Sequence, residues 1–348
     1  MTAPPPPSAA AALADPAAFL ALGLQLAASK AGSLALALVE RALAVHGGDP
    51  AWEAAAAAIR AAEVPDFHVR MLRDSLRNAA YRAAIERFAR GRTVLDIGTG
   101  SGLLAMMAAR AGATRVFACE ADPMLAASAR KVIAANGLAD RIKVFDCHSG
   151  KLDRQRDLGG EVDMVVSEIF AEGVIGEGVL DSLAHARAEL AAPGALFVPE
   201  QADIMVALAQ FPASDAAAGM VEGFDLAAFA PHLRGRRWVY ADDPALVLRS
   251  AATQLMRFDF SEGNPPASGT AQCLLASDGG HVTGLAQWLR LTFAPDITYE
   301  NRPGSAPDLH WVINLAPAAP RETAPGERFN AGLTYAADTL ALWCAPES

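Results

Sequence analysis

The sequence lacks several features that mark common functional classes. Its four cysteines have no CxxC spacing, so we predict neither a zinc site nor a disulfide framework: Cys119, Cys147, Cys273 and Cys344. Basic residues are outnumbered, with 29 Lys and Arg against 39 Asp and Glu, and the net charge of −10 argues against general nucleic-acid binding. No Lys-Ser or Lys-Thr pair follows the glycines near residue 98, which excludes a phosphate-binding P-loop.

The sequence also has no apolar run long enough to cross a bilayer. The longest run is AFLALGLQLAA, from Ala18 to Ala28, and residues 1–17 before it contain no Lys or Arg. We therefore predict no membrane span and no secretory signal, and we expect a cytoplasmic protein. The length of 348 residues is enough for two domains that each have a core.

Residues 1–62 are expected to form a disordered tail and a helical hairpin. The tail is the low-complexity MTAPPPPSAAAALADP, and two amphipathic segments follow it, Phe19–Ser29 and Leu34–Val45. These two segments resemble one tetratricopeptide unit, and a plain helical hairpin is the alternative. Because a single hairpin cannot bury both of its faces, we expect it to pack on the next domain or on another subunit.

Residues 63–197 show the alternation that is typical of a parallel sheet covered by helices. A helical stretch from Phe67 to Phe88 comes first. Segments that read as strand or helix then follow in the order TVLDIGTG, SGLLAMMAARAGA, RVFACEAD, PMLAASARKVIAANG, IKVFDCHS and VDMVVSEIF. Strands separated by helices of this length predict parallel pairing, with helices on both faces of the sheet.

Residues 198–348 have a different pattern. Short apolar runs such as ADIMVALAQF, WLRLTF and HWVINLAPA are separated by turn residues and not by long helices. This pattern predicts a mostly antiparallel β domain. The predicted fold class is therefore α/β, with a parallel sheet covered by helices, followed by a mostly antiparallel β domain and preceded by a short helical segment.

The glycines of VLDIGTGSG follow the first predicted strand, at the edge where such sheets bind ligands. Gly98 and Gly100 allow a tight turn and the close approach of a ligand. Asp96 precedes them and would repel the pyrophosphate of a dinucleotide, which disfavours a dehydrogenase. S-adenosylmethionine suits this acid better, because it carries a sulfonium and an ammonium but no phosphate. Glu120, about twenty residues after the glycines, can accept the ribose hydroxyls. The alternatives are a helix N-cap for Asp96 and a solvated strand end for Glu120.

Four segments resemble the protein arginine N-methyltransferase family, a family of class I S-adenosylmethionine-dependent methyltransferases. They occur in that family's order: MLRDSLRNAAYRAAI, VLDIGTGSGLLAMMAARAGATRVFACEAD, SEIFAEGVIGEG and LHWVINL. The resemblance covers residues 67–348 and implies a Rossmann-like domain followed by a β-barrel-like domain. It implies S-adenosyl-L-methionine as the cofactor, an arginine-containing protein or peptide as the substrate, and a homodimer. We expect no nucleic-acid partner, no membrane association and no bound metal.

The resemblance also implies roles for individual residues. The implied cofactor-binding residues are Met71, Arg77, Asp96, Gly98, Gly100, Glu120, His148 and Ser149. Among them, Arg77 would pair with the cofactor's carboxylate, and the backbone of His148 and the side chain of Ser149 would line its adenine. The implied catalytic residues are Glu168, Glu177 and His310, and Trp311 would contact the substrate.

Two glutamates, Glu168 and Glu177, suit a guanidinium substrate. A guanidinium is planar, stays charged and offers five donors, so two carboxylates can hold one terminal nitrogen toward a methyl sulfonium. They would also favour positive charge away from the attacking nitrogen and so raise its nucleophilicity. The alternative for each glutamate is an ordinary solvated loop residue.

The sequence departs from the family pattern at two places. Phe67 and His68 stand in AAEVPDFHVR, where the family has a tyrosine-rich helix, and Leu309 replaces the threonine of a Thr-His-Trp loop. Two alternatives therefore stay open. One is a methyltransferase acting on a small guanidine compound, and the other is a non-catalytic scaffold with a vestigial methyltransferase domain, which the missing tyrosine favours. A dimerisation arm is expected in, or replaced by, the segment after GFDLAAF.

Overall fold

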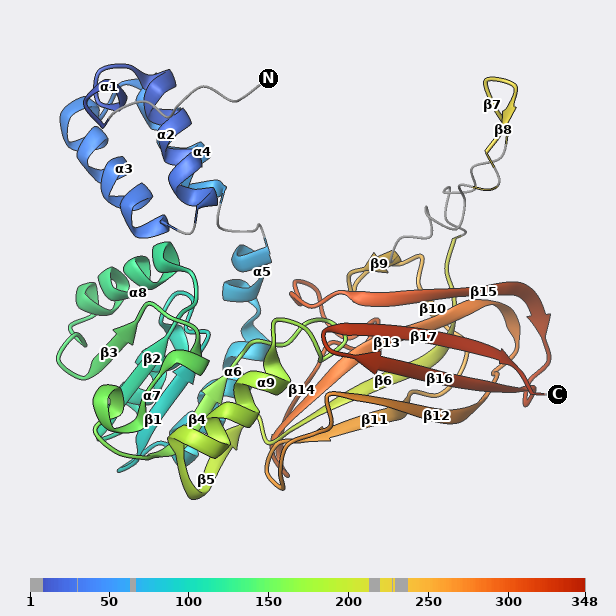
Figure 1. Ribbon diagram of the computed structural model, residues 1–348. Helices are drawn as coiled ribbons and strands as arrows, with labels where there is room; N and C mark the ends of the chain where they lie inside the picture. The colour runs from blue at the N-terminus through green and yellow to red at the C-terminus, as the bar shows by residue number, and fades with distance from the viewer. Residues whose placement is uncertain are drawn as a thin grey trace. The chain divides into compact units, whose positions relative to one another are not determined.

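The computed structural model describes residues 9–29, 31–62, 67–212, 220–226, 228 and 237–347. The chain forms two compact units that interleave along the sequence (Figure 1). The first unit comprises Met1–Val69, Ile85–Glu168 and His185–Leu196, and the second comprises Arg70–Ala84, Ile169–Ala184 and Phe197–Ser348. The division at residues 62 and 197 expected from the sequence stays a prediction.

A five-stranded sheet forms the centre of the first unit, in the order β3-β2-β1-β4-β5. Its strands are β1 (Thr93–Ile97), β2 (Arg115–Cys119), β3 (Ile142–Phe145), β4 (Val162–Ser167) and β5 (Ala191–Val198). β1 pairs in parallel with β2 and β4, and β2 pairs in parallel with β3. The predicted parallel sheet is confirmed.

The connections of this sheet follow from local sequence signals. α7 (Leu103–Arg110) and α8 (Pro123–Ala135) lie between successive strands. The turn before α7 contains Gly98, Gly100 and Gly102 at φ of 75°, 53° and 82°, a region that favours glycine. α8 begins at a proline, and the Asp122 carboxylate accepts hydrogen bonds from the N–H groups of Met124 and Leu125.

An N-terminal helical bundle packs on α8, one of the helices of the first unit. It consists of α1 (Ala9–Ala12), α2 (Pro16–Ala28), α3 (Gly32–His46) and α4 (Pro50–Ala61). The two predicted helices are confirmed as α2 and α3, whereas α4 was not predicted. α3 contacts α8, and Met124 of α8 belongs to the same apolar core as Phe19, Val39 and Trp52 (Figure 1). The expected packing on the next domain is thus observed, and the tetratricopeptide pattern stays a prediction. Residues 1–8 of the expected disordered tail lie outside the described residues. The rest of the tail was predicted wrongly, because Ala9–Ala12 form α1 and Pro16 begins α2, with the Asp15 carboxylate capping that helix.

The helical stretch expected from Phe67 to Phe88 is two helices, α5 (Phe67–Arg73) and α6 (Ser75–Phe88). The interruption falls at Asp74, whose carboxylate accepts a hydrogen bond from the N–H of Arg77 at 2.9 Å. This bond satisfies an N–H in the first turn of α6 that has no partner within the helix. Among the described residues, no helix is long and apolar enough to span a bilayer.

Antiparallel strands make up most of the second unit. The larger sheet contains β6 (Gln201–Gln210), β9 (Arg237–Val239), β10 (Val247–Leu248), β11 (Thr253–Asp259), β13 (Gly280–Ala294), β14 (Ile297–Glu300) and β15 (Ile313–Thr323). The smaller sheet contains β12 (Ser268–Ala276), β16 (Arg328–Ala336) and β17 (Thr339–Pro346).

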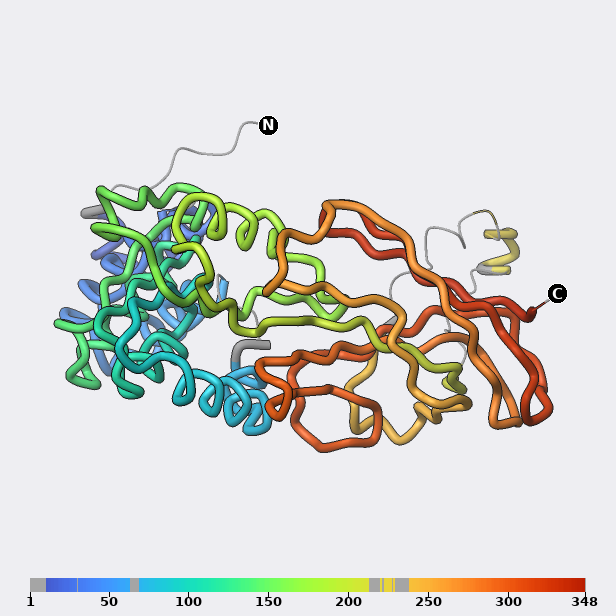
Figure 2. The backbone as a smooth tube through the Cα atoms, turned by 90° about the horizontal axis from the view of Figure 1, so that it is seen from below, coloured from blue at the N-terminus to red at the C-terminus, as the bar shows by residue number. Residues whose placement is uncertain are grey.

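The two antiparallel sheets adjoin each other. β11 contacts β12 and β15 contacts β17, and Figure 2 shows the long strands running together. The rings of Phe258 and Tyr335, one from each sheet, lie 5.4 Å apart in the shared core. The predicted β-barrel-like domain is confirmed. A small hairpin precedes β9, formed by β7 (Met220–Val221) and β8 (Phe224–Asp225). The arm was expected in, or replaced by, the segment after residue 229, and residues 230–236 of that segment lie outside the described residues.

Candidate active site

Asp96 lies at the carboxyl end of β1 and holds the glycine turn against α7. Its Oδ2 accepts hydrogen bonds from the Thr99 hydroxyl at 2.6 Å and from the N–H of Ala105 at 3.1 Å. The residue is 1% exposed. This is close to the helix-capping role that the sequence left as the alternative, and a cofactor contact of Asp96 stays a prediction.

Glu120 follows the carboxyl end of β2 and is bonded to the same turn. Its Oε2 accepts from the N–H of Gly100 and its Oε1 from the N–H of Asp122, both at 3.0 Å. A carboxylate has about four acceptor positions, so two remain for donors such as ribose hydroxyls. A Cβ atom added at Gly100 would meet no atom within 4 Å, so there is open space beside this glycine. Both features fit a nucleoside cofactor.

His148 and Ser149 follow β3, the next strand of the sheet. His148 Nδ1 accepts a hydrogen bond from the N–H of Gly150 at 3.1 Å, which begins a short helix at Ser149–Lys151. Ser149 is 2% exposed, and its hydroxyl has no hydrogen-bond partner within the described structure. Because a buried hydroxyl without a partner is costly, Ser149 fits a position that is completed by a polar ligand.

Glu168 directly follows β4 and is half-buried. The next residues, 169–178, are called the glutamate loop here. Within it, Val174, Gly176, Glu177 and Gly178 have φ of 70°, 140°, 50° and 68°. At the valine and the glutamate this conformation costs about 1–3 kcal/mol each, and such strain persists only where the surroundings impose it. Glu177 itself is exposed, before α9 (Val179–His185).

Asp74, Tyr299 and His310 form a buried cluster in the second unit. Asp74 Oδ2 accepts from the Tyr299 hydroxyl at 2.7 Å and from the N–H of His310 at 3.1 Å, and it lies 3.2 Å from His310 Nδ1. Burial raises the pKa of Asp74, but the hydrogen bonds from His310, Arg77 and Tyr299 outweigh burial and hold this pKa below its ordinary value. With Nδ1 donating to Asp74, Nε2 is the nitrogen of His310 that can accept a proton. Sequence reasoning gave neither Asp74 nor Tyr299 a role.

Trp311 connects the His310 segment to the glutamate loop. Its ring centroid lies 3.8 Å from that of His310, and its Nε1 donates to the carbonyl oxygen of Phe170 at 2.8 Å. Trp311 is 5% exposed, so most of its surface is in contact with the protein. The predicted contact with substrate stays a prediction.

Met71 and Arg77 lie on α5 and α6. Met71 is half-buried. Arg77 is 3% exposed, donates from Nη1 to the Asn78 side chain at 2.8 Å and lies 5.0 Å from the ring centre of Tyr81. A guanidinium has the fork of donors that binds a carboxylate strongly, and the cofactor contacts of Met71 and Arg77 stay predictions.

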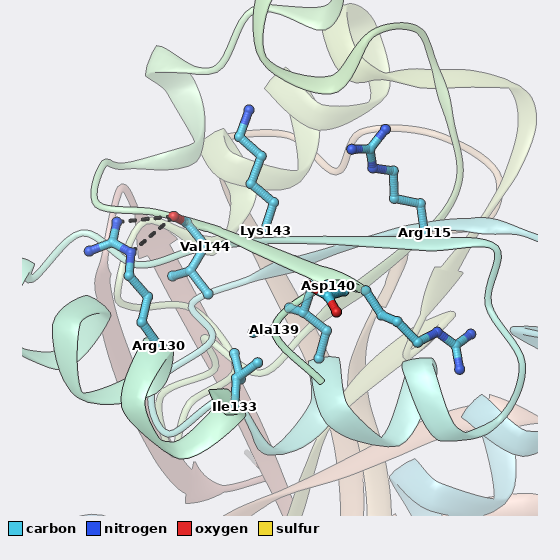
Figure 3. Close-up of a pocket in the computed structure, with 9 residues that line it drawn as sticks. Arg115, Arg130, Ile133, Ala139, Asp140, Lys143 and Val144 are labelled. Carbon is cyan, nitrogen blue, oxygen red and sulfur yellow. Dashed lines mark hydrogen bonds between the residues drawn. The ribbon is translucent and has the colours of Figure 1, made fainter. Parts of the chain in front are cut away.

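A pocket of about 420 Å³ lies elsewhere in the first unit, over β3 and the beginning of β2 (Figure 3). Its lining includes Arg115, Arg130 and Lys143, but Figure 3 shows Lys143 and Arg115 on one side of the strand and Arg130 on the other. Arg130 donates to the carbonyl oxygen of Val144 at 3.0 Å. None of the predicted cofactor residues lines this pocket, so it is a different place. No cluster of His, Cys, Asp and Glu suited to a metal occurs among the described residues.

Comparison with known sequences finds methyltransferases. The family model for ribosomal protein L11 methyltransferase (PrmA) matches residues 82–199. An arginine N(omega)-methyltransferase of Streptomyces achromogenes subsp. streptozoticus is 41% identical over 261 residues, which cover 73% of this chain and 71% of that protein. Protein arginine N-methyltransferase 7 of Drosophila melanogaster is 38% identical over 149 residues, which are 41% of this chain and only 22% of the relative.

Solved structures share the fold. The Trypanosoma brucei PRMT1 enzyme-prozyme complex with AdoHcy superposes with a TM-score of 0.71 at 22% identity, covering 81% of this chain and 94% of that one. Protein arginine methyltransferase 10 of Arabidopsis thaliana gives 0.64 at 19% identity, covering 80% and 95%. The fold and the 41% identity to a relative of similar extent lead to one family. The chain belongs to the S-adenosylmethionine-dependent arginine methyltransferases.

Proposed function

We propose that the protein transfers a methyl group from S-adenosylmethionine to a guanidinium nitrogen of arginine in a protein or peptide, with Glu168 and Glu177 gripping the guanidinium. The strained glutamate loop carries this proposal. Glu177 adopts a φ of 50° and Val174 of the same loop a φ of 70°, a conformation that is uncommon for residues other than glycine. Backbone strain concentrates where a side chain must be presented in one geometry.

The predicted cofactor residues would each bind a different part of the cofactor. Glu120 would bind the ribose with its remaining acceptor positions, Ser149 would contact the adenine, and Arg77 would hold the carboxylate. When bound, S-adenosylmethionine supplies a methyl group on a positively charged sulfur. Asp96 supports this arrangement by fixing the turn that contains Gly98 and Gly100.

The two glutamates would orient the substrate and polarise it. Paired hydrogen bonds from a guanidinium to carboxylates are short, strong and directional. They would fix one terminal nitrogen for in-line attack and draw positive charge toward the others. The new bond to the methyl group would give the attacking nitrogen an additional positive charge as the methyl–sulfur bond breaks, so this nitrogen must lose a proton. His310 Nε2 can accept it, and the negative charge of Asp74 beside Nδ1 would stabilise the resulting imidazolium.

The test is amide substitution of each glutamate. Glu168→Gln and Glu177→Gln should each lower the rate of methyl transfer to an arginine peptide by about 10²–10³, the loss typical of removing one stabilising group from a transition state. Glu172→Gln is the matched control, because Glu172 lies in the same loop between them. The rate is measured as transfer of the label from labelled cofactor to the peptide. Calorimetry should show unchanged cofactor affinity. A wild-type rate in either variant would show that this glutamate is an ordinary loop residue.

A small guanidine compound is the second candidate substrate. The name of the Streptomyces relative specifies arginine without mention of a protein, and 71% of that relative aligns here. Free arginine and an arginine peptide, offered separately with labelled cofactor, distinguish the two candidates when the products are identified by mass spectrometry. Label on neither, with cofactor still bound, would instead support the vestigial scaffold.

Homodimer formation is also a proposal, supported by the family resemblance, and a cytoplasmic location stays a prediction. Sedimentation of the purified protein would check the first. A single species at the mass of 36.2 kDa would contradict it.

A further inference from the structure

Two buried amide side chains of the barrel, Gln287 and Asn314, are linked by hydrogen bonds to the glutamate loop. Gln287 of β13 is 0% exposed, and its Nε2 donates to the carbonyl oxygen of Glu172 at 2.8 Å. Asn314 of β15 is 4% exposed, and its Nδ2 donates to Gln287 Oε1 at 2.7 Å. The two residues are direct partners across the β13–β15 pair. They form a chain of hydrogen bonds that runs from Asn314 through Gln287 to the loop.

These amides stand where apolar side chains would ordinarily be found. The neighbours of Gln287 along β13, Ala286 and Trp288, are both 0% exposed. Burying an amide is unfavourable unless its hydrogen bonds are made, so apolar residues would be the simpler choice for stability. The loop also fits closely around the pair. A Cβ atom added at Gly173 would come within 2.9 Å of the Leu340 side chain and 4.0 Å of Gln287 Oε1.

The strained part of the loop needs such contacts. Its first turn closes with a hydrogen bond from the N–H of Val174 to the carbonyl oxygen of Ala171 at 2.9 Å. The carbonyls on either side of Ala171 are both held by side chains. Trp311 bonds to Phe170, and Gln287 bonds to Glu172, each at 2.8 Å. Fixing both carbonyls restricts the backbone that leads to Glu177.

We propose that Gln287 and Asn314 are positioning residues, which hold the glutamate loop so that Glu177 is presented to the guanidinium. This inference rests on the proposed function. The direction of the hydrogen-bond chain matters, because Asn314 donates to Gln287 and leaves the N–H₂ group of Gln287 to face Glu172. A glutamate at 287 would keep the size and the acceptor for Asn314. When ionised, however, it has no donor for the carbonyl of Glu172.

Gln287→Glu is therefore the informative variant, with Gln210→Glu as its matched control. Gln210 also lies in the barrel, but its Oε1 accepts from Arg249, which a carboxylate does equally well. We expect Gln287→Glu to lower methyl transfer by up to about 100-fold, as small misplacements of a reacting group do. Cofactor affinity should stay unchanged, and Gln210→Glu should retain the wild-type rate. Asn314→Ala, which frees the Gln287 amide to rotate, is the second variant if Gln287→Glu does not fold.

Coupling to Glu177 separates positioning from general destabilisation. If Gln287 acts through Glu177, the double variant Gln287→Glu with Glu177→Gln should be no slower than Glu177→Gln alone. Losses that multiply in the double variant would overturn the positioning role, and so would a wild-type rate in Gln287→Glu.

Hydrogen exchange distinguishes this proposal from the proposed function. The amides of residues 169–178 should exchange faster in Gln287→Glu than in the wild type or in Gln210→Glu. Unchanged exchange there would overturn the positioning role whatever the rates are. Wild-type activity in Glu177→Gln would instead overturn the assignment of Glu177, and with it the need to position that residue.

Discussion

Asp74 connects three parts of the second unit through one carboxylate. It separates α5 from α6, bonds the N–H of Arg77 and bonds both Tyr299 and His310. The sequence pattern MLRDSLR drew attention to Met71 and Arg77 but not to Asp74. Its partners Tyr299 and His310 lie 225 and 236 residues further along the chain, and no local pattern reveals contacts over that separation.

Asp74→Asn should change the dependence of stability on pH. At neutral pH we expect the variant to be less stable by about 1–3 kcal/mol, because buried donors lose a charged acceptor. The folded pKa of Asp74 lies below its ordinary value, so its stabilisation is complete above about pH 4 and is lost as the pH falls through the folded pKa. Urea unfolding between pH 7 and pH 3 should show the difference between the two proteins shrinking. A constant difference would mean that the charge of Asp74 does not contribute.

Arg77→Met should weaken cofactor binding by about 1.5–3 kcal/mol, the usual value of a hydrogen bond to a charged group. Methionine keeps much of the buried length of the arginine side chain and removes its charge. Arg73→Met is the matched control, because Arg73 is exposed and lies just before α6. Calorimetry with S-adenosylmethionine measures both variants. Equal affinities for Arg77→Met and Arg73→Met would remove Arg77 from the cofactor site.

At the scale of elements, regular patterns were predictable and isolated signals were missed. The strands β1–β4 and the helices α7 and α8 were predicted, because alternating apolar strands and amphipathic helices repeat several times. α4 was missed because HGGDP was interpreted as the end of a hairpin. Its start signal was nevertheless present, since Asp49 accepts a hydrogen bond from the N–H of Ala51 and Pro50 occupies the first helical position.

Some residues of the candidate site were likewise predictable from the sequence, and others were not. The position of Glu120 follows from spacing, because the carboxyl ends of neighbouring parallel strands share an edge. Gln287 and Asn314 have no such spacing. Their only signal is an amide within an apolar strand, as in GLAQWLRL and WVINLAP, and the partner of that amide depends on the tertiary fold.

The contact between α3 and α8 gives a prediction at this scale. A Cβ atom at Gly32 would lie 2.8 Å from Met124 Cβ and 3.0 Å from its backbone nitrogen, so neither can easily move away. Gly32→Val should therefore destabilise the first unit by about 1–3 kcal/mol through overpacking. Gly263→Val is the control, because a Cβ there meets nothing within 4 Å. Chemical denaturation would reveal the loss, and equal stability of the two variants would contradict the close packing.

The N-terminal bundle is expected to matter for the solubility of the whole molecule but not for its cofactor affinity. Every predicted cofactor residue lies beyond residue 70, so deletion of residues 1–62 should leave the affinity for S-adenosylmethionine unchanged. Deletion of residues 1–50 should do the same but should aggregate more, because it keeps α4 with the apolar Trp52 and Ile59 stripped of their partners. Calorimetry and light scattering measure the two effects. A folded deletion variant that binds no cofactor would show that the bundle contributes to the site.

The interleaving of the two units has a consequence for how the protein is made. Residues Arg70–Ala84 leave the ribosome early, yet the unit to which they belong is completed only by Phe197–Ser348. At typical synthesis rates, the 225 residues between Asp74 and Tyr299 take on the order of 10–50 s to add. During that interval the nascent chain carries the Asp74 carboxylate and α6, whose contact residues in the second unit have not yet been synthesised. Premature termination before β14 would therefore leave Asp74 without Tyr299 and His310, two of the three residues whose hydrogen bonds lower its pKa. Such fragments are expected to be substrates for chaperones and proteases.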